Sequence, residues 1–212
     1  MLNDRITVNK KHIDAANVVV DDILPEIGQK YIMAIGGEVG SGKSTLAYTI
    51  AMRLKKEGVK SKIIDLDDFY KVPPHERKQW RRDHGIESVG PDEYDWDSIN
   101  TLIGDFRQGR KSTMPCVDLI TSEVDQLRTS FKGIRVLIIN GLYATKLNQA
   151  DFRVFIELTY TETKEAQLFG QKEEMTGFRK QILEREHKMV QALKPGCDMF
   201  FDFDAILDKY HL

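Results

Sequence analysis

The chain has 212 residues, 41% hydrophobic and 30% charged, and its 31 Lys and Arg against 33 Asp and Glu give a formal net charge of −2. A core of this size can bury roughly 70% of the surface of the unfolded chain, so we expect one domain, residues 1–212, that needs no metal or disulfide staple. The near-neutral charge argues against partners bound by bulk electrostatics, such as nucleic acid or an anionic membrane. Two widely spaced cysteines and an amino-terminal stretch without a long apolar run favour a reduced, cytoplasmic protein.

The first predicted elements are a helix, a strand and a second helix. Residues 14–27 favour an opening helix that ends near Pro25 and covers only an edge of the core. The apolar run Tyr31–Ile35 is closed by two glycines, which predicts a strand buried on both faces. From Lys43 to Gly58, apolar residues recur every fourth position, which predicts a helix that follows a glycine-rich turn.

Later short apolar runs predict further strands at 63–66, 136–139, 154–158 and within 199–207. Strands that alternate with helices predict an α/β fold, here a doubly wound parallel sheet of about five strands with helices on both faces. Residues 71–132 form a long polar insertion after the second strand, and such insertions usually serve function in an α/β enzyme. A charged, helix-prone stretch follows at 161–193.

A phosphate-binding pattern, GxxxxGK[ST], lies between the first predicted strand and the next helix. Its glycines let successive backbone N–H groups turn toward one anion, and the helix amino terminus adds partial positive charge. The pattern predicts a P-loop NTPase-type fold that binds ATP, with Lys43 at the β- and γ-phosphates and the Ser44 hydroxyl on Mg²⁺. The predicted nucleotide-binding residues are Gly37, Glu38, Val39, Gly40, Ser41, Gly42, Lys43, Ser44 and Thr45.

Three carboxylates, Asp65, Asp67 and Asp68, stand at the end of the second predicted strand. Ligands in open α/β sheets bind outside the carboxyl ends of the strands, so these acids should share a crevice with the phosphate loop. A carboxylate there can accept the proton of an attacking hydroxyl or orient Mg²⁺ through water. Each of the three can instead cap a helix, and Asp67 is our candidate for the catalytic base.

Three segments together resemble the uridine kinase and phosphoribulokinase family of small-molecule kinases, which includes pantothenate, glycerate and nicotinamide riboside kinases: GGEVGSGKST, IIDLDDFYKVPP and GPDEYDWDSI. The resemblance covers about residues 30–205. It implies that Asp67 is the catalytic aspartate and that Tyr70 is an aromatic residue on the substrate side. By the same likeness, Asp118 in PCVDL takes the place of the aspartate in the family's P-x-Y-D segment, which implies a substrate-binding role.

The chain departs from the family pattern in two places. Asn140 follows the third predicted strand, where uridine kinases usually carry a glutamate, so the metal site loses a charge. The family's lid is rich in arginine around an Arg-Gly pair, whereas this chain has Thr176-Gly177 there. Arg179 is the lid cation that we expect to stabilise the transferring phosphoryl group, although a solvated helix face paired with glutamates is the alternative. The other lid cations are Lys172, Lys180 and Arg185.

Other conspicuous residues carry weaker expectations. His75 and His84 flank the basic run of the insertion and are interpreted as solvated loop histidines rather than substrate contacts. Trp96 either walls a substrate pocket or packs the insertion onto the sheet. The aromatic residues of the last strand, Phe200, Phe201 and Phe203, are expected in the core.

The sequence therefore predicts a kinase that transfers the γ-phosphoryl group of ATP to a hydroxyl of a small metabolite, with a nucleoside such as uridine as first acceptor. A kinase of a sugar phosphate, glycerate, pantothenate or nicotinamide riboside is the alternative within the fold. A regulatory module that binds nucleotide with little transfer is the alternative of another class. The expected ligands are ATP, Mg²⁺ and a small hydroxylated substrate, without nucleic acid or membrane, and a homo-oligomer is left open.

Overall fold

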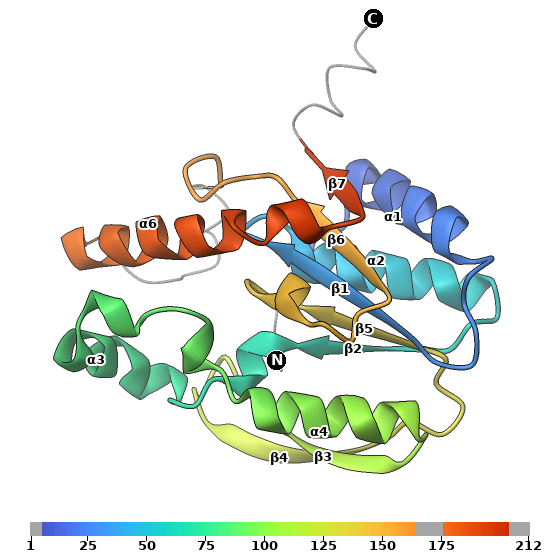
Figure 1. The fold of residues 1–212 in the computed structure, drawn as a ribbon, viewed down its shortest axis with the longest axis horizontal. Helices are drawn as coiled ribbons and strands as arrows, with labels where there is room; N and C mark the ends of the chain where they lie inside the picture. Colours follow the sequence, from blue (N-terminus) through green and yellow to red (C-terminus); the bar gives the residue numbers. More distant parts are fainter. Residues whose placement is uncertain (1–5, 164–175, 204–212) are drawn as a thin grey trace, which may run out of the picture.

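The computed structural model describes residues 6–163 and 176–203. Its central feature is a five-stranded sheet with the strand order β2-β5-β1-β6-β7, in which every neighbouring pair is parallel (Figure 1). This confirms the predicted doubly wound sheet. Its strands are β1 (Tyr31–Gly37), β2 (Ser61–Asp65), β5 (Val136–Asn140), β6 (Phe152–Ile156) and β7 (Met199–Phe201).

Helices cover both faces of the sheet, as predicted. The side chains of β1 alternate between the two cores that these helices form with the sheet. Met33 and Ile35 point toward α1 (Lys10–Ile23) and α2 (Lys43–Lys56). Ile32 and Ala34 point toward the opposite core, to which α4 and α6 contribute. The other described α-helices are α3 (Pro74–His84), α4 (Trp96–Arg107) and α6 (Gly177–Gln191). Two further strands, β3 (Lys111–Val117) and β4 (Val124–Ser130), form a separate pair.

The opening helix lies deeper in the fold than its sequence indicated. The expectation that it covers only an edge of the core is wrong, because α1 packs along α2 and buries a full stripe of side chains. Asn9 caps the helix by accepting a hydrogen bond from the backbone N–H of His12, and the helix ends at Ile23, before Pro25. The stripe consists of Ala15, Ala16, Val19, Val20 and Ile23, each at most 1% exposed.

The insertion after β2 is folded throughout rather than being one polar excursion. A 3₁₀ turn at Leu66–Phe69 leads from β2 into the insertion, which contains α3 and α4 and ends in an antiparallel hairpin of β3 and β4. This hairpin was not predicted. The hairpin has a period-two signal, since Ser112, Met114 and Cys116 are buried while Lys111 and Thr113 are exposed. β3 packs on α4 and on the 3₁₀ turn, and so fixes the insertion beside the end of β2.

The last predicted strand is present, but it is shorter than predicted. β7 has only three residues, and Phe200 is 43% exposed, so its assignment to the core is wrong, whereas Phe201 and Phe203 are buried. Residues 204–207 of the predicted last strand, and 164–175 of the predicted lid, lie outside the described residues. Within the part of the chain that is described, no helix has the length and apolar character needed to cross a membrane.

Candidate active site

The phosphate loop connects the end of β1 to the start of α2, as the sequence predicts. Gly37 has φ 144°, and a Cβ there would lie 2.9 Å from both Ser41 Oγ and the Ile156 carbonyl oxygen. Gly42 has φ 94°, in the left-handed region, and is the amino-terminal cap of α2. Both positions require glycine, because a side chain would be strained there and, at Gly37, would also clash. The chain can therefore make its tight turn over the helix terminus.

The loop offers donors for an anion. The first N–H groups of α2, at Lys43, Ser44 and Thr45, have no acceptor within the helix, whose ladder begins with Leu46 N–H on the Gly42 carbonyl. Ser41 Oγ is buried and has no hydrogen-bond partner among the described residues. Because the helix dipole points its positive end at the same place, the loop fits the phosphates of a nucleotide.

The cation and the hydroxyl of the motif face this loop. Lys43 Nζ donates to the Glu38 carbonyl oxygen at 2.7 Å, so the ammonium group is folded across the loop. Ser44 Oγ donates to Asn140 Oδ1 at 3.3 Å, and Asp65 occupies the position paired with Asn140 at the end of the neighbouring strand β2. Among the described residues no cluster of three His, Cys, Asp or Glu could hold a metal by itself. Ser44 with nearby oxygens fits Mg²⁺ carried by nucleotide phosphates and water.

The three carboxylates after β2 have different environments. Asp68 is buried and accepts a hydrogen bond from the Val117 backbone N–H at 2.8 Å, so it anchors the hairpin. Asp65 caps the 3₁₀ turn by accepting from the Asp67 N–H, and burial together with the Asp67 charge raises its pKa to about 7. Asp67 is only half-buried, and its Oδ1 lies 3.4 Å from the Tyr94 hydroxyl, which donates to it. Asp67 therefore stays our candidate for the base, because Asp68 serves the hairpin and Asp65 caps the 3₁₀ turn.

Two tyrosines, whose rings are tilted against each other, lie on the insertion side of Asp67. The rings of Tyr70 and Tyr94 lie 4.1 Å apart, and the Tyr94 hydroxyl donates to that of Tyr70 at 2.6 Å. The guanidinium of Arg77 lies 3.4 Å from the centre of the Tyr70 ring and donates to the Val72 carbonyl oxygen. Burial raises the pKa of both phenols, so they remain neutral hydrogen-bonding groups. The predicted substrate-side residue Tyr70 therefore stands beside Asp67 through Tyr94.

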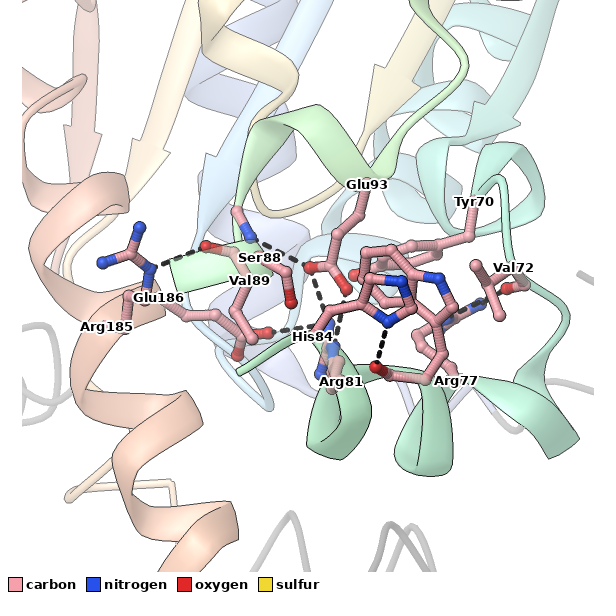
Figure 2. Close-up of polar contacts among 12 residues, drawn as sticks. Tyr70, Val72, Arg77, Arg81, His84, Ser88, Val89, Glu93, Arg185 and Glu186 are labelled. Atoms are coloured by element: carbon pink, nitrogen blue, oxygen red, sulfur yellow. Dashed lines mark hydrogen bonds and ion pairs between the residues drawn. The ribbon is translucent and has the colours of Figure 1, made fainter. Parts of the chain in front are cut away.

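A buried charge cluster lies close to Tyr70 (Figure 2). Arg81 of α3 donates to both carboxylate oxygens of Glu93, at 2.6 and 2.9 Å, and to Oε1 of Glu186 on α6 at 3.4 Å. All three side chains are at most 6% exposed. Burial raises the pKa of Glu186, whose Oε2 has no hydrogen-bond partner among the described residues. The cluster joins the insertion to α6.

This cluster was not predicted, although the basic run of the insertion and the GPDEYD segment both contribute to it. Arg77 and Arg81 are four residues apart on α3, so they lie on one helix face, and Glu93 belongs to the GPDEYD segment. That spacing is a usable signal for a basic face turned inward. The partner Glu186 is 105 residues from Arg81, and no local pattern connects them.

Glu38, predicted among the nucleotide-binding residues, has a structural side chain. It is 2% exposed, and its carboxylate accepts hydrogen bonds at 2.7 Å from the Tyr160 backbone N–H, His187 Nδ1 and Gln191 Nε2. His187 and Gln191 both belong to α6 and lie one turn apart. The loop is therefore tied to the helix that follows the predicted lid, and only the Glu38 backbone is positioned to line the phosphates.

The lid cations have separate environments. Arg179 is half-buried near the start of α6 and electrostatically lowers the pKa of Glu186 against the effect of burial. Lys180 is exposed and lies 3.8 Å from Glu184, the helical pairing that was the alternative to a catalytic role. Arg185 donates to the Val89 and Glu87 carbonyl oxygens and so holds the insertion against α6 (Figure 2). Lys172 lies outside the described residues.

Four other residues singled out in the sequence lie around the insertion. The Asp118 carboxylate accepts a hydrogen bond from the Ile120 N–H at 2.7 Å in the turn of the hairpin. Asp118 directly follows Val117, whose N–H donates to Asp68. His75 and His84 are exposed, and His84 stacks on Trp80. Trp96, the first residue of α4, donates to the Pro91 carbonyl oxygen and packs, partly buried, against the core. Packing thus accounts for Trp96.

Comparison with known proteins identifies the family. The sequence profile of the phosphoribulokinase/uridine kinase family matches residues 32–162, more than half of the chain and all of the loop and carboxylates described above. The chain belongs to this family. The resemblance noted from the three sequence segments is confirmed, and residues 32–162 include the strands from β1 to β6 except for Tyr31, the first residue of β1.

Relatives with different named acceptors share this similarity. The bifunctional alpha-galactosidase/sucrose kinase of Mediterraneibacter gnavus is 24% identical over 192 residues, 83% of this chain and 20% of that enzyme. The uridine kinase of Ureaplasma urealyticum is 29% identical over 134 residues, 59% of this chain and 61% of that kinase. The chain thus spans less than two thirds of the length of both. A crystal structure from Silicibacter sp., provisionally named a fructose transport system kinase, has TM-score 0.66 at 16% identity and covers 90% of this chain and 98% of that one.

Proposed function

We propose that this protein transfers the γ-phosphoryl group of ATP to a hydroxyl group of a small metabolite. The observation that carries the proposal is the juxtaposition of the phosphate loop after β1 with Asp67 after β2, on either side of Asn140 at the end of β5. Asp67 is half-buried and is held at its Oδ1 by Tyr94. A phosphate cradle facing a carboxylate across one crevice is the arrangement that phosphoryl transfer to an alcohol needs.

In the proposed reaction the protein positions the two substrates and stabilises charge, and it forms no covalent bond to either of them. The acceptor oxygen forms a bond to the γ-phosphorus, the bond from that phosphorus to the ADP oxygen breaks, and Asp67 accepts the proton of the hydroxyl. Lys43 and Arg179 stabilise the charge on the transferring group. When bound, Mg²⁺ supplies further charge neutralisation at the β- and γ-phosphates, held in part by Ser44.

A nucleoside such as uridine is the first acceptor in this proposal, supported by the similarity to uridine kinases. A sugar is the second candidate, supported by the wider match to the sucrose kinase, 83% of the chain against 59% for the uridine kinase. Both acceptors present hydroxyl groups to Asp67, and they differ in the surface that the insertion must recognise.

The test is a steady-state assay of ADP release with Mg·ATP and a panel of acceptors: uridine, cytidine, fructose, sucrose and glycerate. We expect one acceptor class to raise ADP release at least tenfold over the rate with water alone. Mass spectrometry of the product then identifies the phosphorylated compound. If Mg·ATP binds and no acceptor in the panel is phosphorylated, the regulatory binding module is the better description; if Mg·ATP does not bind, the phosphate site itself is wrong.

A further inference from the structure

The strand order separates the two ends of the phosphate loop. On one side of β1 stand β5 and β2, which carry Asn140 and the carboxylates, and Ser44 Oγ contacts Asn140 on that side. On the other side stand β6 and β7. Since a triphosphate is an extended chain whose γ end lies near Asp67 in the proposed function, its nucleoside leaves the loop on the side away from Asp67.

His12 lies beside the loop at a point that no motif of the sequence indicates. Its Nε2 is 3.1 Å from the position that a Cβ on Gly42 would occupy, at the cap of α2. Its ring centre is 5.0 Å from that of Phe203, which follows β7 and is buried. α1 packs along α2, so the helix that precedes β1 holds this imidazole against the loop.

The hydrogen bonds of His12 fix which ring nitrogen carries the proton. The Asn9 backbone N–H lies 3.4 Å from Nδ1 and donates to it, while Asn9 Oδ1 accepts from the His12 backbone N–H. With Nδ1 as acceptor, the neutral imidazole bears its hydrogen on Nε2. Burial, followed by the neighbouring Lys11, lowers the pKa of His12, so the ring is neutral at pH 7. Within residues 6–163 and 176–203, no hydrogen bond is found at Nε2.

We propose that His12 binds the nucleoside of the phosphoryl donor, with Nε2–H donating to a sugar oxygen or ring nitrogen beside the Gly42 cap. The inference rests on the proposed function and extends it to α1, an element outside the region matched by the family profile. A half-buried imidazole backed by Phe203 offers both an edge donor and an apolar face, which a purine nucleoside can use together.

Calorimetric titration with two ligands tests this proposal: Mg·ATP, and Mg·tripolyphosphate, which has the phosphates without a nucleoside. We expect His12→Ala to weaken Mg·ATP binding about tenfold, the range for loss of one hydrogen bond and a ring contact, and to leave tripolyphosphate binding unchanged. Asn9→Ala is the matched control, because it removes the same cap of α1 and keeps the imidazole next to Gly42. It should bind both ligands like the parent.

Several outcomes overturn the inference. Parental Mg·ATP affinity in His12→Ala, or equal weakening of both ligands, would mean that His12 does not contact the nucleoside. If His12→Ala fails to fold, His12→Phe retains an aromatic ring against Phe203 without the donor, and it should still lose affinity for Mg·ATP alone. If the parent protein binds neither ligand, both the proposed function and the role of His12 are contradicted. If the parent binds both ligands, the proposed phosphate site stands, and the His12 variants then test the nucleoside contact alone.

Discussion

In the proposed function, the phosphoryl donor and the acceptor bind at two ends of one site, and these two ends are built in different ways. The donor end is one continuous segment, 37–45, whose binding groups are mainly backbone N–H groups exposed by glycine turns. The acceptor end combines α3, the 3₁₀ turn at Pro91–Glu93 and α6, and its buried ion pairs link residues up to 105 positions apart. A short local motif therefore specifies the first, while tertiary packing must assemble the second.

This difference predicts different sensitivities to substitution. Groups at the donor end are presented by local backbone geometry, so removing a functional side chain there should leave the fold intact. At the acceptor end, Arg81 is held between two buried carboxylates, and removing any member leaves a charge in a low-dielectric interior. Substitutions at the two ends should therefore separate catalysis from stability.

The largest expected effect is at the donor end, where Lys43→Ala should reduce kcat by at least about 10³-fold. The ammonium group serves the β- and γ-phosphates, and its stem is half-buried at the helix start rather than in the core. The midpoint of urea unfolding should stay within the error of the parent. Turnover close to that of the parent would contradict both the phosphate site and the proposed difference between the donor and acceptor ends.

The next effect is at the acceptor end and concerns stability. Arg81→Ala should lower the free energy of unfolding by about 3 kcal/mol, because Glu93 and Glu186 lose their buried partner. Protonation of the stranded carboxylates relieves this cost, so the loss should be smaller at pH 5 than at pH 8. Urea unfolding at both pH values measures it.

The matched control for that variant is Arg82→Ala, one residue further along α3 and exposed. It should change the free energy of unfolding by less than about 0.5 kcal/mol. Mg·ATP affinity should survive in both variants, because neither residue lies at the phosphate loop. An Arg81→Ala protein as stable as Arg82→Ala would show that the buried cluster does not hold the acceptor end together.

The same contrast explains what could be predicted from the sequence. The succession of strands and helices along the chain, the loop, and the candidacy of Asp67 follow from patterns within short windows: apolar runs, GxxxxGK[ST], and acids at a strand end. The pairing of Arg81 with Glu186, and of Glu38 with His187, joins segments more than 100 residues apart. Helical periodicity shows that a face is polar or apolar, but it does not show which distant face covers it.

The burial of α1 was underestimated for a related reason. Its stripe of small apolar residues is interspersed with acids, and the sequence alone does not show that α2 provides a surface for it. Likewise, the three aspartates after β2 look equivalent in sequence. They separate only when Val117 of the hairpin, an element that was not predicted, uses Asp68 as its acceptor.

Asp67 stands where the two ends meet, so its substitution should affect chemistry with little effect on either binding step. Asp67→Asn keeps the shape and removes the charge, and we expect kcat to fall about 10²-fold with Mg·ATP affinity nearly unchanged. Single-turnover and calorimetric measurements separate the two quantities. Asp68→Asn serves as the comparison, because that side chain accepts from the Val117 N–H and should not act as the base. A loss confined to Asp65→Asn or Asp68→Asn would reassign the base.

The smallest effect concerns the lid helix and decides to which end α6 contributes. Arg179 is half-buried and acts on Glu186, whereas the exposed Lys180 lies 3.8 Å from Glu184, so of these two we propose Arg179 as the cation that meets charge on the transferring group. Arg179→Ala should lower kcat about tenfold, or roughly 1.4 kcal/mol of transition-state stabilisation, with KM for ATP little changed. Lys180→Ala should match the parent in the same steady-state assay.

If Arg179→Ala loses stability instead of kcat, α6 belongs to the structural cluster of the acceptor end, and the charge on the transferring group must be met from elsewhere. Lys172 is then the remaining candidate among the four lid cations expected from the sequence, because Lys180 pairs with Glu184 and Arg185 donates to the Val89 carbonyl oxygen. Parental kcat in Lys172→Ala, Arg179→Ala and Lys180→Ala alike, measured with the true acceptor, would contradict the lid mechanism. Catalysis would then depend on Lys43 as the cation at the transferring group, and the donor end alone would carry the electrostatic work of the reaction.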